Sequence, residues 1–171
     1  METPVNNNKL LELLKELSKG NVKFVVCGGV ACFLQGVERV TYDLDISASL
    51  DSENLKNLIE VTKKYDLIPR VPEPAENLLD ENKRNDWINK KGALVFTFTS
   101  NKNLVQLDIF LKYPKSYEEL LRNADVMDID GIKVCVSSKD DLIFAKEYIV
   151  PLRDKDNFDI QQLKKMKNDR K

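Results

Sequence analysis

The sequence predicts an α/β protein in which helices flank a small mixed β-sheet. Leucines recur at helical spacing between residues 10 and 17, which is typical of an amphipathic helix. A short apolar run rich in β-branched residues, at residues 22–27, indicates a buried strand. Residues 42–48 alternate between apolar and polar side chains, as a strand with two different faces does. Similar patterns follow along the chain, so we expect a sheet with helices packed against it.

The composition suits one domain that spans residues 1–171. Hydrophobic residues make up 42% of the chain and charged residues 32%, which supplies a core and argues against global disorder. The 27 basic and 28 acidic residues give a formal net charge of -1, so no overall field attracts nucleic acid or an anionic membrane. We expect a frayed N-terminus at residues 1–8, and a C-terminal helix with a basic tail at residues 152–171.

The first half of the chain predicts helices and strands in alternation. Asn8 is a plausible N-cap of the first helix. A glycine pair ends the first strand, and a short helix at residues 30–34 precedes the alternating strand. Ser52 begins the next helix. The stretch at residues 66–92 contains three prolines and little periodicity, and we expect one helical piece within it at residues 75–81.

The second half predicts two hairpins and further helices. Residues 93–99 and 104–111 form the arms of the first hairpin around a polar connection. The second hairpin turns at residues 130–131, an Asp-Gly dipeptide that is typical of tight turns. Either Ser137 or Ser138 then caps a helix, and the C-terminal helix follows it.

Cysteine and histidine content excludes several classes of site. Cys27, Cys32 and Cys135 lie in apolar surroundings without a CxxC pair, so we expect buried free thiols and a reducing cytoplasm. The chain has no histidine, which excludes imidazole zinc sites and His-based triads. No apolar run approaches the ~20 residues that a membrane span needs, so we expect no association with a membrane.

Three aspartates are candidates for a metal site. Asp43 and Asp45 lie two positions apart in the alternating strand, so their side chains point to the same face. Without a cation the two carboxylates would repel, and the pKa of one would rise. Mg²⁺ removes this repulsion and typically binds one or two carboxylates together with substrate phosphates. Asp108 supplies a third carboxylate if its strand is a neighbour, and three carboxylates can hold metal for phosphoryl or nucleotidyl transfer. A solvated strand face is the alternative for the aspartate pair alone.

Gly28 and Gly29 directly follow the first strand and precede a short helix. Because glycine has no Cβ, backbone N–H groups here can approach phosphate oxygens, and the helix N-terminus favours anions at the same place. A tight turn without a ligand is an equally plausible interpretation of the pair alone. The combination of a strand, a glycine pair, a helix, an Asp-x-Asp strand and a third strand aspartate is more specific than any of its parts.

These residues carry a resemblance to a known family. The run CGG at residues 27–29, a spacer of thirteen residues and the run DLDI at residues 43–46 resemble the first motif of the nucleotidyltransferase fold of the polymerase-β superfamily. The run RVTYDLD at residues 39–45, Lys146 and the run RDKDNFD at residues 153–159 resemble small prokaryotic nucleotidyltransferases of abortive-infection and toxin–antitoxin systems. The resemblance spans residues 22–163. Many members have serine where this chain has Gly29, so phosphate contact here would rest on the backbone.

The resemblance implies a nucleotidyltransferase-like fold and an enzyme that depends on Mg²⁺ or Mn²⁺. It would transfer a nucleoside monophosphate from an NTP to a hydroxyl acceptor: RNA such as tRNA, a protein or a small molecule. A cognate antitoxin or a homo-oligomer would be a candidate partner. The catalytic and metal-binding residues would be Asp43, Asp45 and Asp108. The nucleotide-binding residues would be Gly28, Gly29, Arg39, Thr41, Lys146, Arg153 and Lys155.

Purely structural roles are the alternatives for the polar residues. Arg39 and Thr41 could close the loop before the second strand, and Lys146 could be a solvated surface lysine. The charged residues at 153–159 could form ion pairs that hold the last helix. The alternative function is a non-catalytic module that binds a nucleotide or a partner protein. The complete set of three carboxylates argues against that alternative.

Overall fold

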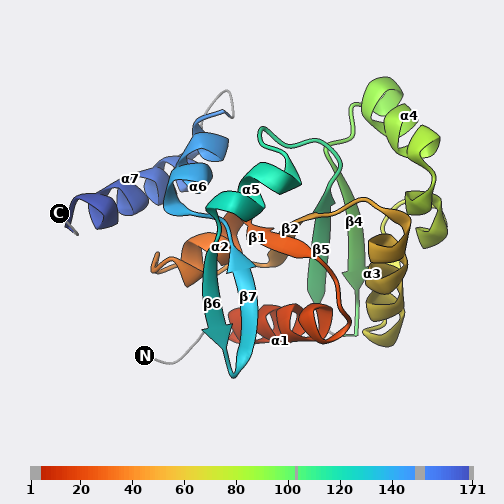
Figure 1. The fold of residues 1–171 in the computed structure, drawn as a ribbon, viewed down its shortest axis with the longest axis horizontal. Coiled ribbons are helices and arrows are strands. Elements are labelled where there is room, and N and C mark those ends of the chain that lie inside the picture. Colours follow the sequence, from red (N-terminus) through yellow and green to blue (C-terminus); the bar gives the residue numbers. More distant parts are fainter. Residues whose placement is uncertain (1–4, 103, 149–152, 170–171) are drawn as a thin grey trace.

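The computed structural model describes residues 5–102, 104–148 and 153–169, and within them seven strands form one mixed sheet (Figure 1). The prediction of an α/β fold with helices flanking a mixed sheet is therefore confirmed. The helices are α1 (Val5–Lys19), α2 (Gly28–Leu34), α3 (Ser52–Lys64), the 3₁₀ helix η1 (Ala75–Leu79), α4 (Glu81–Lys91), α5 (Tyr117–Asn123), α6 (Lys139–Glu147) and α7 (Asp154–Asp169). The strands are β1 (Phe24–Cys27), β2 (Asp43–Ala48), β3 (Ile68–Pro69), β4 (Val95–Ser100), β5 (Val105–Phe110), β6 (Asp125–Ile129) and β7 (Ile132–Val136).

The strand order is β3-β4-β5-β2-β1-β7-β6. Sequence neighbours pair antiparallel in β1–β2, β3–β4, β4–β5 and β6–β7. Two pairs are parallel, namely β2 with β5 and β1 with β7. The β2–β5 pair joins segments that lie far apart in the sequence. The candidate site lies beside this pair, at the centre of the sheet.

Strand alternation gives the sheet two different faces. Leu44 and Ile46 of β2, together with Leu107 and Ile109 of β5, are fully buried in the main hydrophobic core, which includes the leucine stripe of α1. The other face carries a smaller apolar cluster around Cys27, covered by α5, and the polar side chains of β2 and β5 beside it. Helices α6 and α7 pack against each other (Figure 1).

The first helix begins earlier than expected, at Val5 rather than after Asn8. Residues 5–8 therefore belong to α1, while residues 1–4 lie outside the described part of the chain. The reason is Asn7, which is buried, donates to Arg39 O at 3.2 Å and accepts from Thr41 N at 3.2 Å. These bonds attach the start of α1 to the loop that precedes β2.

Other helix boundaries follow from local capping. Ser52 begins α3 as predicted, and Asp51 caps this helix because its side chain accepts from Asn54 N. Ser138 caps α6, so the choice between the two serines is resolved. The expected helical piece at residues 75–81 consists of η1 and the first residue of α4. Of the expected C-terminal segment at residues 152–171, the structure describes α7, and residues 152, 170 and 171 lie outside its description. Across the described residues, no helix combines the length and the apolar character that crossing a membrane requires.

Candidate active site

The parallel pairing of β2 and β5 brings the three predicted aspartates together. In this register Asp45 lies opposite Asp108, and Asp43 lies opposite Gln106. Each of the three aspartates offers a carboxylate oxygen, and these oxygens lie within 4.8 Å of one another. The long-range contact on which the metal-site hypothesis depended is therefore present in the structure.

The three carboxylates repel one another in the absence of a cation. Burial, followed by the charges of Asp108 and Asp43, raises the pKa of Asp45 well above its usual range. Burial and the charge of Asp108 likewise raise the pKa of Asp43. A divalent cation would remove this repulsion, and a set of hard carboxylate oxygens suits Mg²⁺ or Mn²⁺. The residues present therefore fit such an ion.

Asp108 also has neutral hydrogen-bond donors around it. Thr97 Oγ1 donates to Asp108 Oδ1 at 2.5 Å, and Gln106 Nε2 lies 3.3 Å from Oδ1 and 3.1 Å from Oδ2. The guanidinium of Arg70 donates in turn to Gln106 Oε1. Sequence analysis did not select these donors. The alternation of β5 had placed Gln106 on the same face as Asp108, but the partner on β4 depends on the register between the two strands.

The glycine pair lies directly against the side chains of the site. Gly28 has a φ of +60°, and a Cβ at this position would lie 2.1 Å from Asp45 Oδ2. A Cβ on Gly29 would lie 2.8 Å from Thr41 Oγ1. Gly28 therefore requires glycine, whereas a side chain at Gly29 would require Thr41 to move. The side chain of Cys27 does not cap α2, so the first N–H groups of this helix face the same space without that cap.

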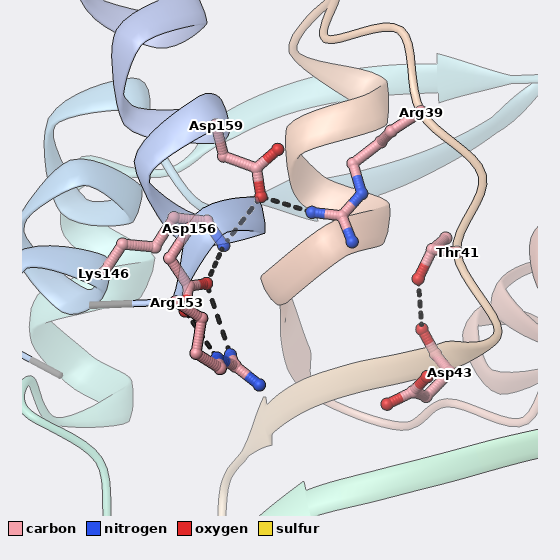
Figure 2. A network of polar contacts seen from close by, with 7 residues as sticks. All are labelled: Arg39, Thr41, Asp43, Lys146, Arg153, Asp156 and Asp159. Carbon is pink, nitrogen blue, oxygen red and sulfur yellow. Dashed lines mark hydrogen bonds and ion pairs between the residues drawn. The ribbon is translucent and has the colours of Figure 1, made fainter. Parts of the chain in front are cut away.

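A network of charges, of which Lys146, Asp156 and Asp159 are buried, joins the loop before β2 to α6 and α7 (Figure 2). Lys146 Nζ lies 3.1 Å from Asp156 Oδ1 and 3.0 Å from Asp159 Oδ2. Arg39 pairs with the same oxygen of Asp159, and Arg153 Nε lies 2.6 Å from Asp156 Oδ2. Lys146 is 7% exposed, which excludes the solvated surface lysine considered above. The alternative of an ion-pair cluster at residues 153–159 is thus present for Arg153, Asp156 and Asp159, whose ionic partners include Lys146 and Arg39.

Interactions within this network shift the pKa values of Asp156 and Lys146 in the directions that favour their charged forms. Burial alone would raise the pKa of Asp156, but hydrogen bonds from Arg153 and Lys146 lower it below its usual value. Burial alone would lower the pKa of Lys146, whereas Cys32 and Asp159 raise it. Asp159 Oδ1 is buried and has no hydrogen-bond partner among the described residues. The two aspartates therefore hold the cations in place while offsetting part of their charge.

A single cavity of about 740 Å³ is lined by every catalytic, metal-binding and nucleotide-binding residue that the sequence suggested. These residues are Gly28, Gly29, Arg39, Thr41, Asp43, Asp45, Asp108, Lys146, Arg153 and Lys155. Lys112 adds a cation that no sequence pattern indicated, and the cavity also has an apolar wall. That wall includes Leu94, Phe110, Tyr113, Pro114, Leu142 and Tyr148. Its residues come from separate elements and follow no common spacing, so the sequence alone offered no pattern for it.

Solved structures share this arrangement of elements. The lincosamide antibiotic adenylyltransferase LnuA, in a lincomycin-bound structure, superposes with a TM-score of 0.64 and 16% identity, covering 95% of this chain and 98% of LnuA. ANT(2'')-Ia in complex with adenylyl-2''-tobramycin superposes with a TM-score of 0.58 and 13% identity over 95% of this chain and 90% of the other. An antigenic nucleotidyltransferase-like protein from Paracoccidioides brasiliensis superposes with a TM-score of 0.57 and 18% identity, covering 96% of this chain and 79% of the other.

The chain has the nucleotidyltransferase fold. No protein-family model matches the sequence, and no curated protein matches it. At such low sequence identity the likeness establishes the fold alone. The narrower kinship with abortive-infection and toxin–antitoxin proteins stays a resemblance of motifs.

On this nucleotidyltransferase fold the cavity combines three features. It has a carboxylate cluster that fits a divalent ion, a glycine turn that allows backbone contact with an anion, and the cations of Arg39, Lys146 and Arg153 along the same lining. Its apolar wall offers a surface for less polar parts of a ligand. The arrangement can bind a polyphosphate and a metal ion at the same place.

Proposed function

We propose that this chain is a nucleotidyltransferase that uses Mg²⁺ or Mn²⁺ to transfer a nucleoside monophosphate from an NTP to a hydroxyl acceptor. The observation that carries the proposal is the convergence of Asp43, Asp45 and Asp108 within 4.8 Å. This cluster lies in the same cavity as the glycine turn and the buried cations. Nucleotidyl transfer needs both a place for metal and a place for the triphosphate.

The triphosphate would lie along the glycine turn. The backbone of Gly28 and Gly29 would approach its oxygens, because no Cβ stands between them and the cavity. Arg39, Lys146 and Arg153 would offset its charge, and Asp156 and Asp159 keep these cations in fixed positions. Thr41 and the exposed Lys155 line the same cavity and would complete the contact with the nucleotide.

Asp43, Asp45 and Asp108 would hold the metal, which when bound supplies positive charge to the phosphate oxygens. Asp108 would also accept the proton of the acceptor hydroxyl. The hydroxyl oxygen then bonds to the α-phosphorus, the bond from this phosphorus to the bridging oxygen breaks, and pyrophosphate leaves. The buried position of Asp108, 7% exposed, would shield this proton transfer from bulk water.

Among the acceptors that the sequence left open, the comparisons favour a small molecule over RNA or protein. The LnuA structure holds lincomycin, and the ANT(2'')-Ia structure holds adenylyl-2''-tobramycin. A cavity of about 740 Å³ with an apolar wall is large enough for a nucleotide and for part of such an acceptor. A cognate antitoxin, a homo-oligomer and a cytoplasmic location stay expectations of the sequence.

Label transfer from each α-labelled NTP tests the proposal. The chain is incubated with Mg²⁺ or Mn²⁺ and with separate acceptor pools: small hydroxyl compounds that include lincomycin and tobramycin, total RNA, and total protein. We expect metal-dependent labelling that Asp43→Asn lowers by at least about 100-fold. Asp86→Asn on α4 is the matched control, because this carboxylate is exposed and lies outside the cavity.

The outcomes separate the two functions considered. NTP binding without label transfer to any pool would favour the non-catalytic module. Absence of NTP binding, or full activity in Asp43→Asn, would contradict the proposed function.

A further inference from the structure

The surroundings of Asp108 follow from the sheet. Thr97 lies directly opposite Asp108 in the antiparallel β4–β5 register. Gln106 precedes Asp108 by two residues on the same strand, so its side chain lies on the same face. The fold therefore places one donor across the strand pair and another along the strand, and both donors contact the most buried carboxylate of the cluster.

Arg70 determines which end of the Gln106 amide faces the cluster. Its guanidinium donates to Gln106 Oε1, and a guanidinium can only donate, so the amide nitrogen is left to point at Asp108. The backbone N–H of Arg70 donates to Thr97 O at 2.9 Å, which attaches this residue to β4. Arg70 thus contacts both residues that donate to Asp108.

We propose that Thr97 and Gln106 are positioning residues for Asp108, and that Arg70 acts through Gln106 by fixing its amide. The inference rests on the proposed function. A carboxylate has about four lone-pair directions. The threonine hydroxyl and the glutamine amide occupy some of them and hold the carboxylate plane, so that the others face Asp43 and Asp45. Partners of this kind typically change metal affinity or activity by about 10–100-fold when they are removed.

Manganese alone is the probe, because its binding to the full chain is measurable by calorimetry or paramagnetic resonance without any turnover. Thr97→Val removes the hydroxyl and keeps the side-chain shape, and Gln106→Met removes the amide at similar length. We expect each to weaken Mn²⁺ binding about tenfold. Thr97→Ser keeps the hydroxyl and is expected to stay within about twofold of the unmodified chain.

Thr99→Val is the matched control. Thr99 lies on the same strand two residues from Thr97 and opposite Gln106, and it is also half-buried. It is expected to leave Mn²⁺ affinity unchanged. Arg70→Met should weaken binding in the unmodified chain and cause no further weakening in the Gln106→Met background, because its loss weakens binding only by releasing the Gln106 amide; the loss of its charge beside Asp43 acts in the opposite direction. Melting temperatures in EDTA measure any effect on folding separately.

Wild-type Mn²⁺ affinity in both Thr97→Val and Gln106→Met would overturn the proposal. Equal weakening in Thr99→Val, or weakening that follows the melting temperature and is not rescued by Thr97→Ser, would show a merely structural role and overturn it as well. If the unmodified chain binds no Mn²⁺, this inference and the proposed function fail together. If it binds Mn²⁺ with the expected variant pattern but transfers no label, the positioning role stands and nucleotidyl transfer fails.

Discussion

In the metal-free protein, Asp45 is repelled by two neighbouring carboxylates, those of Asp108 and Asp43. Its pKa is raised by burial and by the charges of Asp108 and Asp43, so the folded chain holds a proton that the unfolded chain releases. The stabilisation from this proton is complete below the ordinary Asp pKa and is lost as pH rises through the raised pKa of the folded state. Above that pH the folded state carries an uncompensated charge in a half-buried site.

Asp45→Asn should therefore stabilise the metal-free protein at neutral pH. The substitution removes the cost of either protonating this carboxylate or burying its charge, which is expected to raise the free energy of unfolding by about 1 kcal/mol and the melting temperature by about 3 °C. The advantage should shrink as pH falls below the ordinary Asp pKa, since both chains are then neutral at this position. Thermal unfolding in EDTA across pH measures it, with Asp86→Asn as the control. An advantage that is independent of pH would contradict the argument.

The aspartates and glycines that the sequence singled out share one property: each belongs to a short local pattern, whereas the basic residues and Thr41 came from the family resemblance. Asp43 and Asp45 follow from alternation, and Gly28 from its place between strand and helix. Asp108 was selected by the alternation of its own segment, and only the strand order shows that it meets the others. Thr97 could not be selected in this way, because its contact with Asp108 depends on the pairing of β4 with β5.

At the scale of elements, the buried charges decide how α6 and α7 attach to the loop before β2. Asp159 of α7 is fully buried and pairs with Lys146 of α6 and with Arg39 of the loop. Three segments therefore meet at one carboxylate. Lys164 of α7 and Glu147 of α6 also form an ion pair. This pair lies at the surface, because each side chain is about half exposed.

Asp159→Ala should lower the free energy of unfolding by about 3 kcal/mol, because it leaves two largely buried cations without this partner. Lys164→Ala removes an exposed ion pair between the same two helices and should cost less than about 1 kcal/mol. Urea denaturation of both variants measures the difference. Equal effects of the two substitutions would show that the buried network contributes no more than a surface pair.

Elements were predictable where one apolar stripe or one alternating run defines them. The stretch at residues 66–92 was not, because α4 buries only Arg84 and Trp87 and its other side chains are polar. The two ends of α4 nevertheless have local causes. Asp80 caps its start by accepting from Asn82 N and Lys83 N, and Gly92 ends it in the left-handed conformation. In a stretch without periodicity, the capping residues therefore mark the ends of the helix better than its side-chain pattern does.

At the scale of the whole molecule, the order of strands brings the site together. The α/β class follows from local patterns, but the insertion of β2 between β1 and β5 does not, because it depends on contacts between distant segments. The motif resemblance implied that Asp108 joins Asp43 and Asp45 at one site, but the strand order itself comes from the structure. The result is a cavity whose walls come from the centre of the sheet, from α2, and from the α6–α7 pair, so a ligand there contacts elements from both ends of the chain.

Binding in that cavity should therefore stabilise the entire fold. A ligand that binds only the folded chain, at 100 times its dissociation constant, adds about 2.7 kcal/mol. For a chain of this size this corresponds to a rise in melting temperature of about 5–10 °C. We expect Mg²⁺ and an NTP together to produce such a rise, EDTA to abolish most of it, and Asp43→Asn to lose it while Asp86→Asn keeps it. An equal rise in melting temperature with an NTP in EDTA would contradict this expectation. Nucleotide binding would then need no cation between the phosphates and the three aspartates, which would place the nucleotide away from Asp43, Asp45 and Asp108.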